Sequence, residues 1–248
     1  MSEPVILLRD VAKAFGAKHV LRGVSLEVER GVTVALLGAS GSGKSVTLKA
    51  VNGLVQPDRG EITVLGYPVS KMSEAALAPL RRRVSYLFQG GALFDSMSVF
   101  DNVAYPLREH ERLDPAALRE RVDELLAMVR LEGVGPLQPS ELSGGMRKRV
   151  AVARALALEP EIMLYDEPTT GLDPVTGGAI ADLIVDLDRR LGVTSLVVTH
   201  DIPLVMRVAE QVVFLHDGAF IFSGSVEAAT REGPDPVREF FAAGGIHA

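Results

Sequence analysis

"TVALLGASGSGKSVTLKAV", residues 33–51, joins three patterns that together decide the fold. Residues 33–38 are β-branched or aliphatic and end in glycine, which is typical of a buried strand. Residues 44–54 are expected to form a helix with Val46, Leu48 and Val51 facing inward. A glycine-rich segment between a strand and a helix predicts a phosphate-binding loop.

The segment "GASGSGKS" has the residue types that phosphate binding needs. Glycine at 38, 41 and 43 lets the backbone approach a phosphate closely, and the following helix adds its positive end. Lys44 supplies a charge for the β- and γ-phosphates, and Ser45 offers a hydroxyl to magnesium. A glycine-serine turn that merely precedes a helix is the alternative, but the flanking strand and helix disfavour it. The predicted nucleotide-binding residues here are Gly38, Ala39, Ser40, Gly41, Ser42, Gly43, Lys44, Ser45 and Val46.

Outside this stretch, composition narrows the class of protein. The chain has 248 residues, of which 47% are hydrophobic and 23% charged, and its net charge of −6 argues against a general nucleic-acid binder. The absence of cysteine excludes disulfides and thiolate metal sites and fits a reducing compartment. The N-terminus lacks a secretory pattern, and no apolar run approaches the roughly 18 residues of a membrane span. We therefore expect a cytoplasmic protein that reaches the membrane through partners.

Strand-like and helix-like segments alternate along the chain. Residues 5–9 and 24–28 are expected to be strands joined by turns, and residues 60–69 further strands of an antiparallel layer. Buried-strand patterns occur at residues 33–38, 84–89, 161–168 and 194–200. This alternation predicts an α/β fold with a mostly parallel sheet and helices on both faces.

Helical spacing interrupts the alternation from about residue 100 to 156. One helix there places on a single face Leu118, Val122, Leu125, Leu126 and Val129. We expect one domain over residues 5–240, with this block as an inserted subdomain at about 95–156. A hairpin-like segment at 212–223 and a helix around Val237–Phe241 precede a short tail, 241–248.

Two carboxylates end the strand in "EIMLYDEP". Asp166 is placed to hold a magnesium-bound water, and Glu167 to accept a proton from an attacking water. Asp-Glu-Pro could also simply end a strand, but a phosphate loop in the same chain favours catalysis.

Several single residues are ambiguous on their own. Gln89, after a strand, could ligate magnesium, and His200, after another, could reach a γ-phosphate, although each could equally be a loop residue. Asp173 could be a turn residue or helix cap, and Phe15 could stack on adenine or belong to the core. The remaining charged candidates are expected to be solvated: His19, His110, His216, His247, Arg81, Arg82 and Arg83.

"ELSGGMRKRVAVARAL", residues 141–156, opens with a second anion-binding pattern. Ser143 is a good helix N-cap, and Gly144 and Gly145 expose N–H groups at the start of the helix. Judged alone, an ordinary capped helix explains it as well.

Five elements in fixed order then stand together: GASGSGKS, Gln89, LSGGM, LYDEP and His200. Over essentially its whole length the chain resembles the nucleotide-binding subunits of ABC transporters. The resemblance implies a P-loop core with an N-terminal antiparallel layer and a helical subdomain that carries Ser143–Met146. It also implies ATP and Mg²⁺ as cofactors and an integral-membrane permease as partner.

The resemblance further implies a head-to-tail homodimer. In such dimers Ser143, Gly144, Gly145 and Met146 of one subunit complete the γ-phosphate site of the other. Phe15 matches the adenine-stacking aromatic, and Asp173 the loop that crosses the dimer. Catalytic and metal positions are matched by Lys44, Ser45, Gln89, Asp166, Glu167 and His200, with Glu167 as general base.

A narrower resemblance rests on "GALFDSMSVFDNVAYPLRE" and on Met146, where most relatives have glutamine. These features are similar to ATP-binding subunits of bacterial phospholipid-trafficking systems that maintain outer-membrane lipid asymmetry. Such systems use mammalian-cell-entry domain proteins and often a STAS-type regulatory subunit. They place the ATPase on the cytoplasmic side of the inner membrane, bound through the permease.

Three other functions share parts of this pattern. The same ATPase could serve an amino-acid or other small-solute importer. A soluble ABC ATPase acting on ribosomes or DNA is disfavoured, because this chain has one cassette and no long coiled coil. A non-catalytic interaction protein is disfavoured because every catalytic position holds a competent residue.

Overall fold

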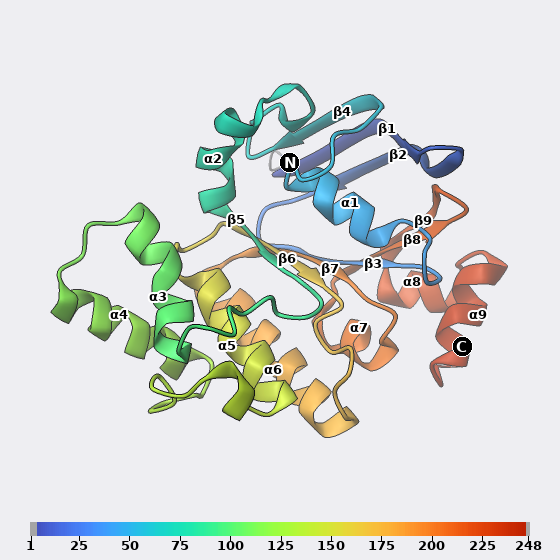
Figure 1. Ribbon diagram of the computed structural model, residues 1–248. Helices are drawn as coiled ribbons and strands as arrows, with labels where there is room; N and C mark the ends of the chain where they lie inside the picture. The colour runs from blue at the N-terminus through green and yellow to red at the C-terminus, as the bar shows by residue number, and fades with distance from the viewer. Residues whose placement is uncertain (1–3, 247–248) are drawn as a thin grey trace.

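A six-stranded sheet forms the centre of the computed structural model, which describes residues 4–246 (Figure 1). The strands lie in the order β5 (Val84–Leu87), β6 (Ile162–Asp166), β7 (Thr194–Val198), β3 (Thr33–Leu37), β8 (Gln211–His216) and β9 (Ala219–Ser225). The first five are parallel, and β9 pairs antiparallel with β8 as the predicted hairpin. Every residue of β3, β6 and β7 is buried, which explains their continuous apolar runs.

A separate three-stranded antiparallel sheet has the order β2 (Lys18–Val28), β1 (Ile6–Phe15) and β4 (Arg59–Val64). The prediction of turns between residues 9 and 24 was wrong, because β1 and β2 pair as far as Phe15 and Lys18. Register shifts along this pair break the strict alternation by which a strand is found in sequence. The prediction of several strands in residues 60–69 was also wrong. The chain turns at Leu65 and Gly66, both with positive φ, and adds only a bridge.

The two faces of the large sheet pack against different layers. Alternate residues of β6 face opposite ways, so that Ile162 and Leu164 join one core cluster and Met163 and Tyr165 another. The first cluster includes α1 (Lys44–Val51) and the antiparallel sheet. The second includes α5 (Gly144–Leu156), α6 (Pro174–Leu191) and part of α7 (Ile202–Val208). These layers confirm the predicted α/β fold with helices on both faces.

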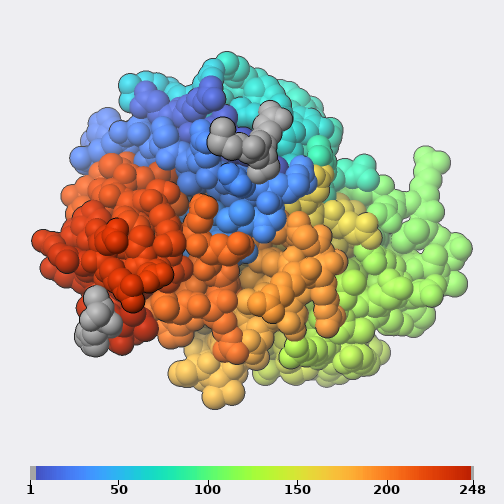
Figure 2. Space-filling view, turned by 180° about the vertical axis from the view of Figure 1, so that it is seen from behind, coloured from blue at the N-terminus to red at the C-terminus, as the bar shows by residue number. Residues whose placement is uncertain are grey.

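The helical block lies to one side of the large sheet. It comprises α3 (Val99–His110) and α4 (Pro115–Met128), which pack with α5. The predicted apolar face of α4 is confirmed: Val122, Leu125, Leu126 and Val129 are buried, and Leu118 packs against them. Figure 2 shows this green region at the opposite end of the molecule from the red C-terminal segment.

Three further helices were not predicted: α2 (Glu74–Arg83), α7 and α8 (Val226–Arg231). Arg81 is not simply solvated, because its side chain donates to the carbonyls of Asn52 and Gly53 after α1. The last helix, α9 (Asp235–Ala243), buries Phe241, so the core extends into the segment expected to be a tail. Residues 247–248, including His247, lie outside the described chain. Within residues 4–246, no helix is long and apolar enough to span a membrane.

Candidate functional site

The phosphate loop connects the carboxyl end of β3 to α1, as the sequence predicted. Gly38 has φ 144°, and a Cβ there would lie 2.2 Å from the backbone oxygen of Leu215, so only glycine fits. Gly43, with φ 115°, provides the N-cap of α1 without a capping side chain. The N-terminus of α1 therefore lacks a side-chain cap where a phosphate would bind.

Lys44 is 6% exposed and folds back over the loop. Its Nζ donates to the carbonyls of Gly38 at 2.8 Å and Ala39 at 3.0 Å. Burial lowers the pKa of Lys44, an effect that the nearby charges of Glu167 and Asp166 oppose. The cation is thus held at the mouth of the loop by weak partners that a phosphate could replace.

Asp166 is the point where three elements meet. Ser45 of α1 donates to its Oδ1 at 2.7 Å, and the Tyr86 hydroxyl of β5 donates to its Oδ2 at 2.8 Å. Burial raises the pKa of Tyr86, with the negative charge of Asp166 as a second cause, so its hydroxyl stays a donor. The hydroxyl of Ser45 and the carboxylate of Asp166 are the hard oxygen ligands that Mg²⁺ prefers, so the site fits this ion.

Glu167 follows with a strained backbone, at φ 51°. Its N–H donates to the carbonyl of Val198 at 2.9 Å. One carboxylate oxygen lies 2.9 Å from Nδ1 of His200, and the other accepts from the Thr170 hydroxyl at 3.2 Å. The hydroxyl of Thr199 lies 3.5 Å away. The carboxylate is therefore oriented by side chains from the loop after β6 and from the loop after β7.

A cavity of about 640 Å³ joins these groups, which is within the range of small-molecule sites. Of the predicted nucleotide-binding residues, it is lined by Phe15, Gly38, Ala39, Ser40, Gly41, Gly43, Lys44, Ser45 and Val46. Gln89, Glu167 and His200 line it as well, whereas Ser42 lines a different pocket, together with Leu215. Phe15 is 51% exposed at its edge, so it is available to a ligand and is not a core residue.

Helix α5 holds the loop that begins at Gln89. Lys148, only 7% exposed, donates to the carbonyl of Gln89 and, at 3.4 Å, to that of Glu167. Arg154 donates to the carbonyls of Gly91 and Ala92 at 2.9 Å each. Burial lowers the pKa of Lys148, and the charges of Glu167 and Asp166 oppose this shift. One helix thus contacts both the loop and the strand end that carry predicted catalytic residues.

The four residues Ser143–Met146, the signature, do not line the cavity. Ser143 caps α5 by accepting from the Met146 N–H at 3.2 Å, and Gly145 lies so close to Thr176 that a Cβ would approach it to 2.4 Å. Asp173 caps α6 by accepting from the N–H groups of residues 175 and 176. The signature and Asp173 therefore lie together on a part of the chain separate from the cavity.

Sequence reasoning missed Tyr86, Lys148 and Phe240, and the last of these also lines the cavity. Tyr86 lies within a strand pattern, and Lys148 appears as one charge among several in "RKR". No motif marks them, because their roles depend on which strand end or helix lies beside them.

Phosphate loop, paired carboxylates and an inserted helical block define the class as P-loop nucleotide-binding proteins. Residues 21–170 match the family described as ABC transporter. The chain is 46% identical over 234 residues to the intermembrane phospholipid transport system ATP-binding protein MlaF of Escherichia coli K12, covering 94% of this chain and 87% of MlaF. It belongs to the ABC transporter family and is an ABC ATPase.

Two further similarities bear on function. The probable ribonucleotide transport ATP-binding protein mkl of Mycobacterium tuberculosis H37Rv is 40% identical over 235 residues, covering 95% of this chain and 66% of mkl. A solved structure of the ATP-binding cassette MJ0796, a dimer in a post-hydrolysis state with ADP and Pi, matches with a TM-score of 0.82 and 34% identity. It covers 89% of this chain and 98% of MJ0796.

Proposed function

We propose that this chain is the ATP-hydrolysing subunit of a membrane ABC transporter and works as a head-to-tail homodimer. The observation that carries the proposal is that Ser143–Met146 do not line the cavity, so we assign them to the site of a second chain. The dimeric MJ0796 cassette supports this assembly. We assign residues 5–243, through the end of α9, to one ATP-binding domain, with residues 95–156 as its helical subdomain.

The residues of one subunit divide the chemistry between them. Lys44 and the loop amides bind the β- and γ-phosphates, while Ser45, Gln89 and Asp166 hold Mg²⁺. Mg²⁺ neutralises charge on the phosphates when bound. Glu167 accepts the proton of the attacking water, because His200 and Thr170 hold its carboxylate in the cavity.

The remaining residues contact the adenine ring and the γ-phosphate or form contacts across the dimer. Phe15 stacks on adenine, and His200, with 62% of its side chain exposed, reaches the γ-phosphate. Ser143, Gly144 and Gly145 offer the N-terminus of α5 to the γ-phosphate of the partner's ATP. Asp173 fixes the start of α6 beside them, and its loop crosses the dimer.

We propose phospholipid movement between membranes as the work that ATP drives. The similarity to MlaF and the methionine at 146 support this substrate. The permease docks on the loop after Gln89, where Phe94 packs against Tyr105 of α3 and both side chains are about 40% exposed. The complex lies on the cytoplasmic side of the inner membrane, with a mammalian-cell-entry domain protein and a STAS-type subunit as further partners and no nucleic acid.

A small-solute transporter is the second candidate, because the mkl relative is named for ribonucleotide transport. Purification of the native membrane complex distinguishes the two. Co-purified phospholipid with a mammalian-cell-entry domain protein supports lipid transport, whereas a periplasmic solute-binding protein supports import.

The catalytic assignment is tested by Glu167→Gln. We expect loss of ATP turnover by at least about 100-fold, since the general base contributes about 10²–10⁴. Nucleotide binding persists, so the variant should accumulate as an ATP-bound dimer in size-exclusion chromatography with light scattering. Phosphate release measures turnover.

Glu120→Gln is the matched control, because it makes the same change on an exposed position of α4. It should hydrolyse ATP like the wild type. Unchanged hydrolysis by Glu167→Gln would remove Glu167 as the base, and a monomer with bound ATP would contradict the split site.

A further inference from the structure

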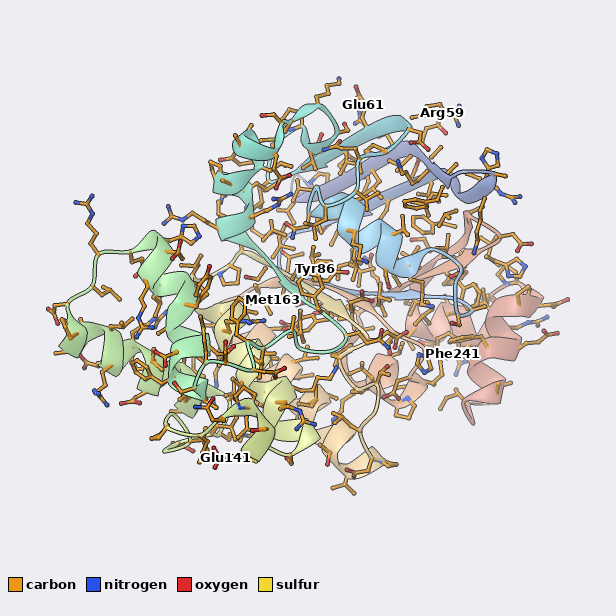
Figure 3. The ribbon with its side chains drawn as sticks, viewed as in Figure 1. Arg59, Glu61, Tyr86, Glu141, Met163 and Phe241 are labelled. Carbon is orange, nitrogen blue, oxygen red and sulfur yellow. The ribbon has the colours of Figure 1, made fainter. Side chains whose placement is uncertain are left out.

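Tyr86 reaches from one strand to the metal-binding carboxylate of the next. In the parallel pair of β5 and β6, Tyr86 lies opposite Leu164, so Asp166 lies two residues further along the same face. Figure 3 shows the labelled Tyr86 side chain over the middle of the large sheet. Its hydroxyl spans the remaining diagonal and ends 2.8 Å from Oδ2 of Asp166.

The two oxygens of Asp166 have different partners. Ser45 donates to Oδ1, and that hydroxyl is the one proposed to turn to Mg²⁺. Oδ2 accepts from Tyr86 and, among residues 4–246, from no other hydrogen-bond donor. When Ser45 binds the ion, Tyr86 is the partner left to fix the plane of the carboxylate.

We propose that Tyr86 is a positioning residue for Mg²⁺, because its hydroxyl holds Asp166 in the orientation that binds the ion. This inference rests on the proposed magnesium site of the ATPase. Hydrogen-bond partners that orient a metal ligand change metal affinity when they are removed. Tyr86 is not among the residues that line the cavity, so it acts only through Asp166.

The hydroxyl can be separated from the ring. The Tyr86 ring packs against Phe88, with ring centres 4.4 Å apart, and it belongs to the apolar layer under α1. Phenylalanine at this position keeps both contacts and removes one oxygen. A change in metal binding is then assigned to the hydrogen bond, and loss of packing does not explain it.

The experiment compares Tyr86→Phe with the wild type in the intact chain. Binding of a non-hydrolysable ATP analogue is measured by calorimetry, first with EDTA and then at increasing Mg²⁺. We expect the affinity without metal to be unchanged and the half-saturating Mg²⁺ concentration to rise about 10-fold. Mn²⁺ binding, followed by electron paramagnetic resonance, should weaken by a similar factor.

Tyr67→Phe is the matched control, because Tyr67 lies in the turn after β4, where its ring faces the guanidinium of Arg83. It should behave as the wild type. Equal half-saturation in Tyr86→Phe and the wild type overturns the inference, as does an equal loss of affinity with and without metal. A wild type whose affinity is indifferent to Mg²⁺ overturns the magnesium site itself, and this inference with it.

Discussion

Glu167 combines backbone strain with a fully engaged side chain. A non-glycine residue at φ 51° is unfavourable by roughly 1–3 kcal/mol unless its surroundings hold it. Its N–H donates a hydrogen bond to the carbonyl of Val198 in β7, and its carboxylate forms hydrogen bonds with the side chains of His200 and Thr170. The strain turns the side chain away from the strand direction and into the cavity. The position of the proposed base is therefore set before any nucleotide arrives.

Phe15 gives a residue-scale prediction that separates binding from folding. Its side chain is half exposed, with the Lys13 ammonium 5.4 Å from its ring centre, so little packing depends on it. Base stacking on an aromatic ring is worth about 1–3 kcal/mol. Phe15→Ala should therefore weaken ATP binding about 10-fold in calorimetry while the melting temperature stays within a degree or two.

Phe15→Tyr is the control and should bind like the wild type, because it keeps the aromatic face. Alanine at 15 with unchanged affinity would place the adenine elsewhere. A large fall in melting temperature would show instead that Phe15 belongs to the core.

Single residues also show how far sequence could lead to the site. Lys44, Ser45, Asp166 and Glu167 were predicted because short motifs carry them, each in a strand-to-loop context. Tyr86 was not, since only the register of β5 against β6 brings its hydroxyl to Asp166. Contacts between neighbouring strands are not encoded in any local pattern.

At the scale of elements, α5 links Ser143 to the loop that begins at Gln89 and to the end of β6. Its N-terminus carries Ser143, its buried face carries Lys148, and its last turn carries Arg154. The last two side chains hold the loop from Gln89 to Ala92 by backbone carbonyls, so that loop and helix move as one. A permease that shifts the loop would then displace the signature and the strand end at Glu167 together.

Lys148→Met tests this connection with a side chain of similar length and no charge. The carbonyls of Gln89 and Glu167 lose a charged donor, and a hydrogen bond to a charged group contributes about 1.5–3 kcal/mol. We expect the turnover number to fall about 10-fold, with the affinity for ATP within about threefold of the wild type. Lys148→Arg should recover part of the turnover, because it restores a cationic donor.

Arg149→Met is the control on the same helix. Arg149 donates to the carbonyls of Val129 and Arg130 in the helical block, away from the cavity. Turnover in this variant should stay near that of the wild type. If Lys148→Met hydrolysed ATP normally, or if both variants lost activity equally, the specific role of Lys148 would be contradicted.

Elements differ in how well sequence predicted them, for physical reasons. The strands β3, β6 and β7 are buried on both faces, so each reads as an apolar run. The long pair of β1 and β2 was underestimated because its bulges and exposed residues disturb the period of two. Helix α8 has only six residues, too few for a helical period to be recognised.

At the scale of the whole molecule, the proposed catalytic residues lie at one end of the large sheet, and a partly buried carboxyl group lies at the other. The carboxyl ends of β3, β6 and β7 lead into the phosphate loop, Asp166–Glu167 and His200. Near their amino ends, Asp188 of α6 accepts from the hydroxyls of Thr33 and Ser195, at 2.8 Å each. The proposed chemistry does not use the charge of Asp188, so we expect this charge to affect stability alone.

Asp188 should make stability depend on pH in an unusual direction. Burial raises the pKa of Asp188 to about 6. The hydrogen bonds from the hydroxyls of Ser195 and Thr33 oppose this rise, and the negative charge of Glu210 adds to it. A carboxyl in the unfolded chain titrates near about 3.9. The pKa of Asp188 is higher in the folded protein than in the unfolded chain. Its contribution to the free energy of unfolding is therefore full below about pH 4 and is lost as the pH rises through about 6. The loss amounts to as much as about 3 kcal/mol.

Urea unfolding of the wild type and Asp188→Asn between pH 4 and 7 measures this contribution. Asparagine carries no charge, so the variant should gain stability relative to the wild type across the window, by up to about 3 kcal/mol. Glu161→Gln is the control of opposite sign, because hydrogen bonds from Arg83 and then Arg30 lower the pKa of Glu161. The variant lacks that carboxylate, so its deficit against the wild type should stay constant from pH 7 down to about 4.5 and shrink only below that pH. A difference between Asp188→Asn and the wild type that is constant with pH would mean that Asp188 keeps its charge in the folded protein.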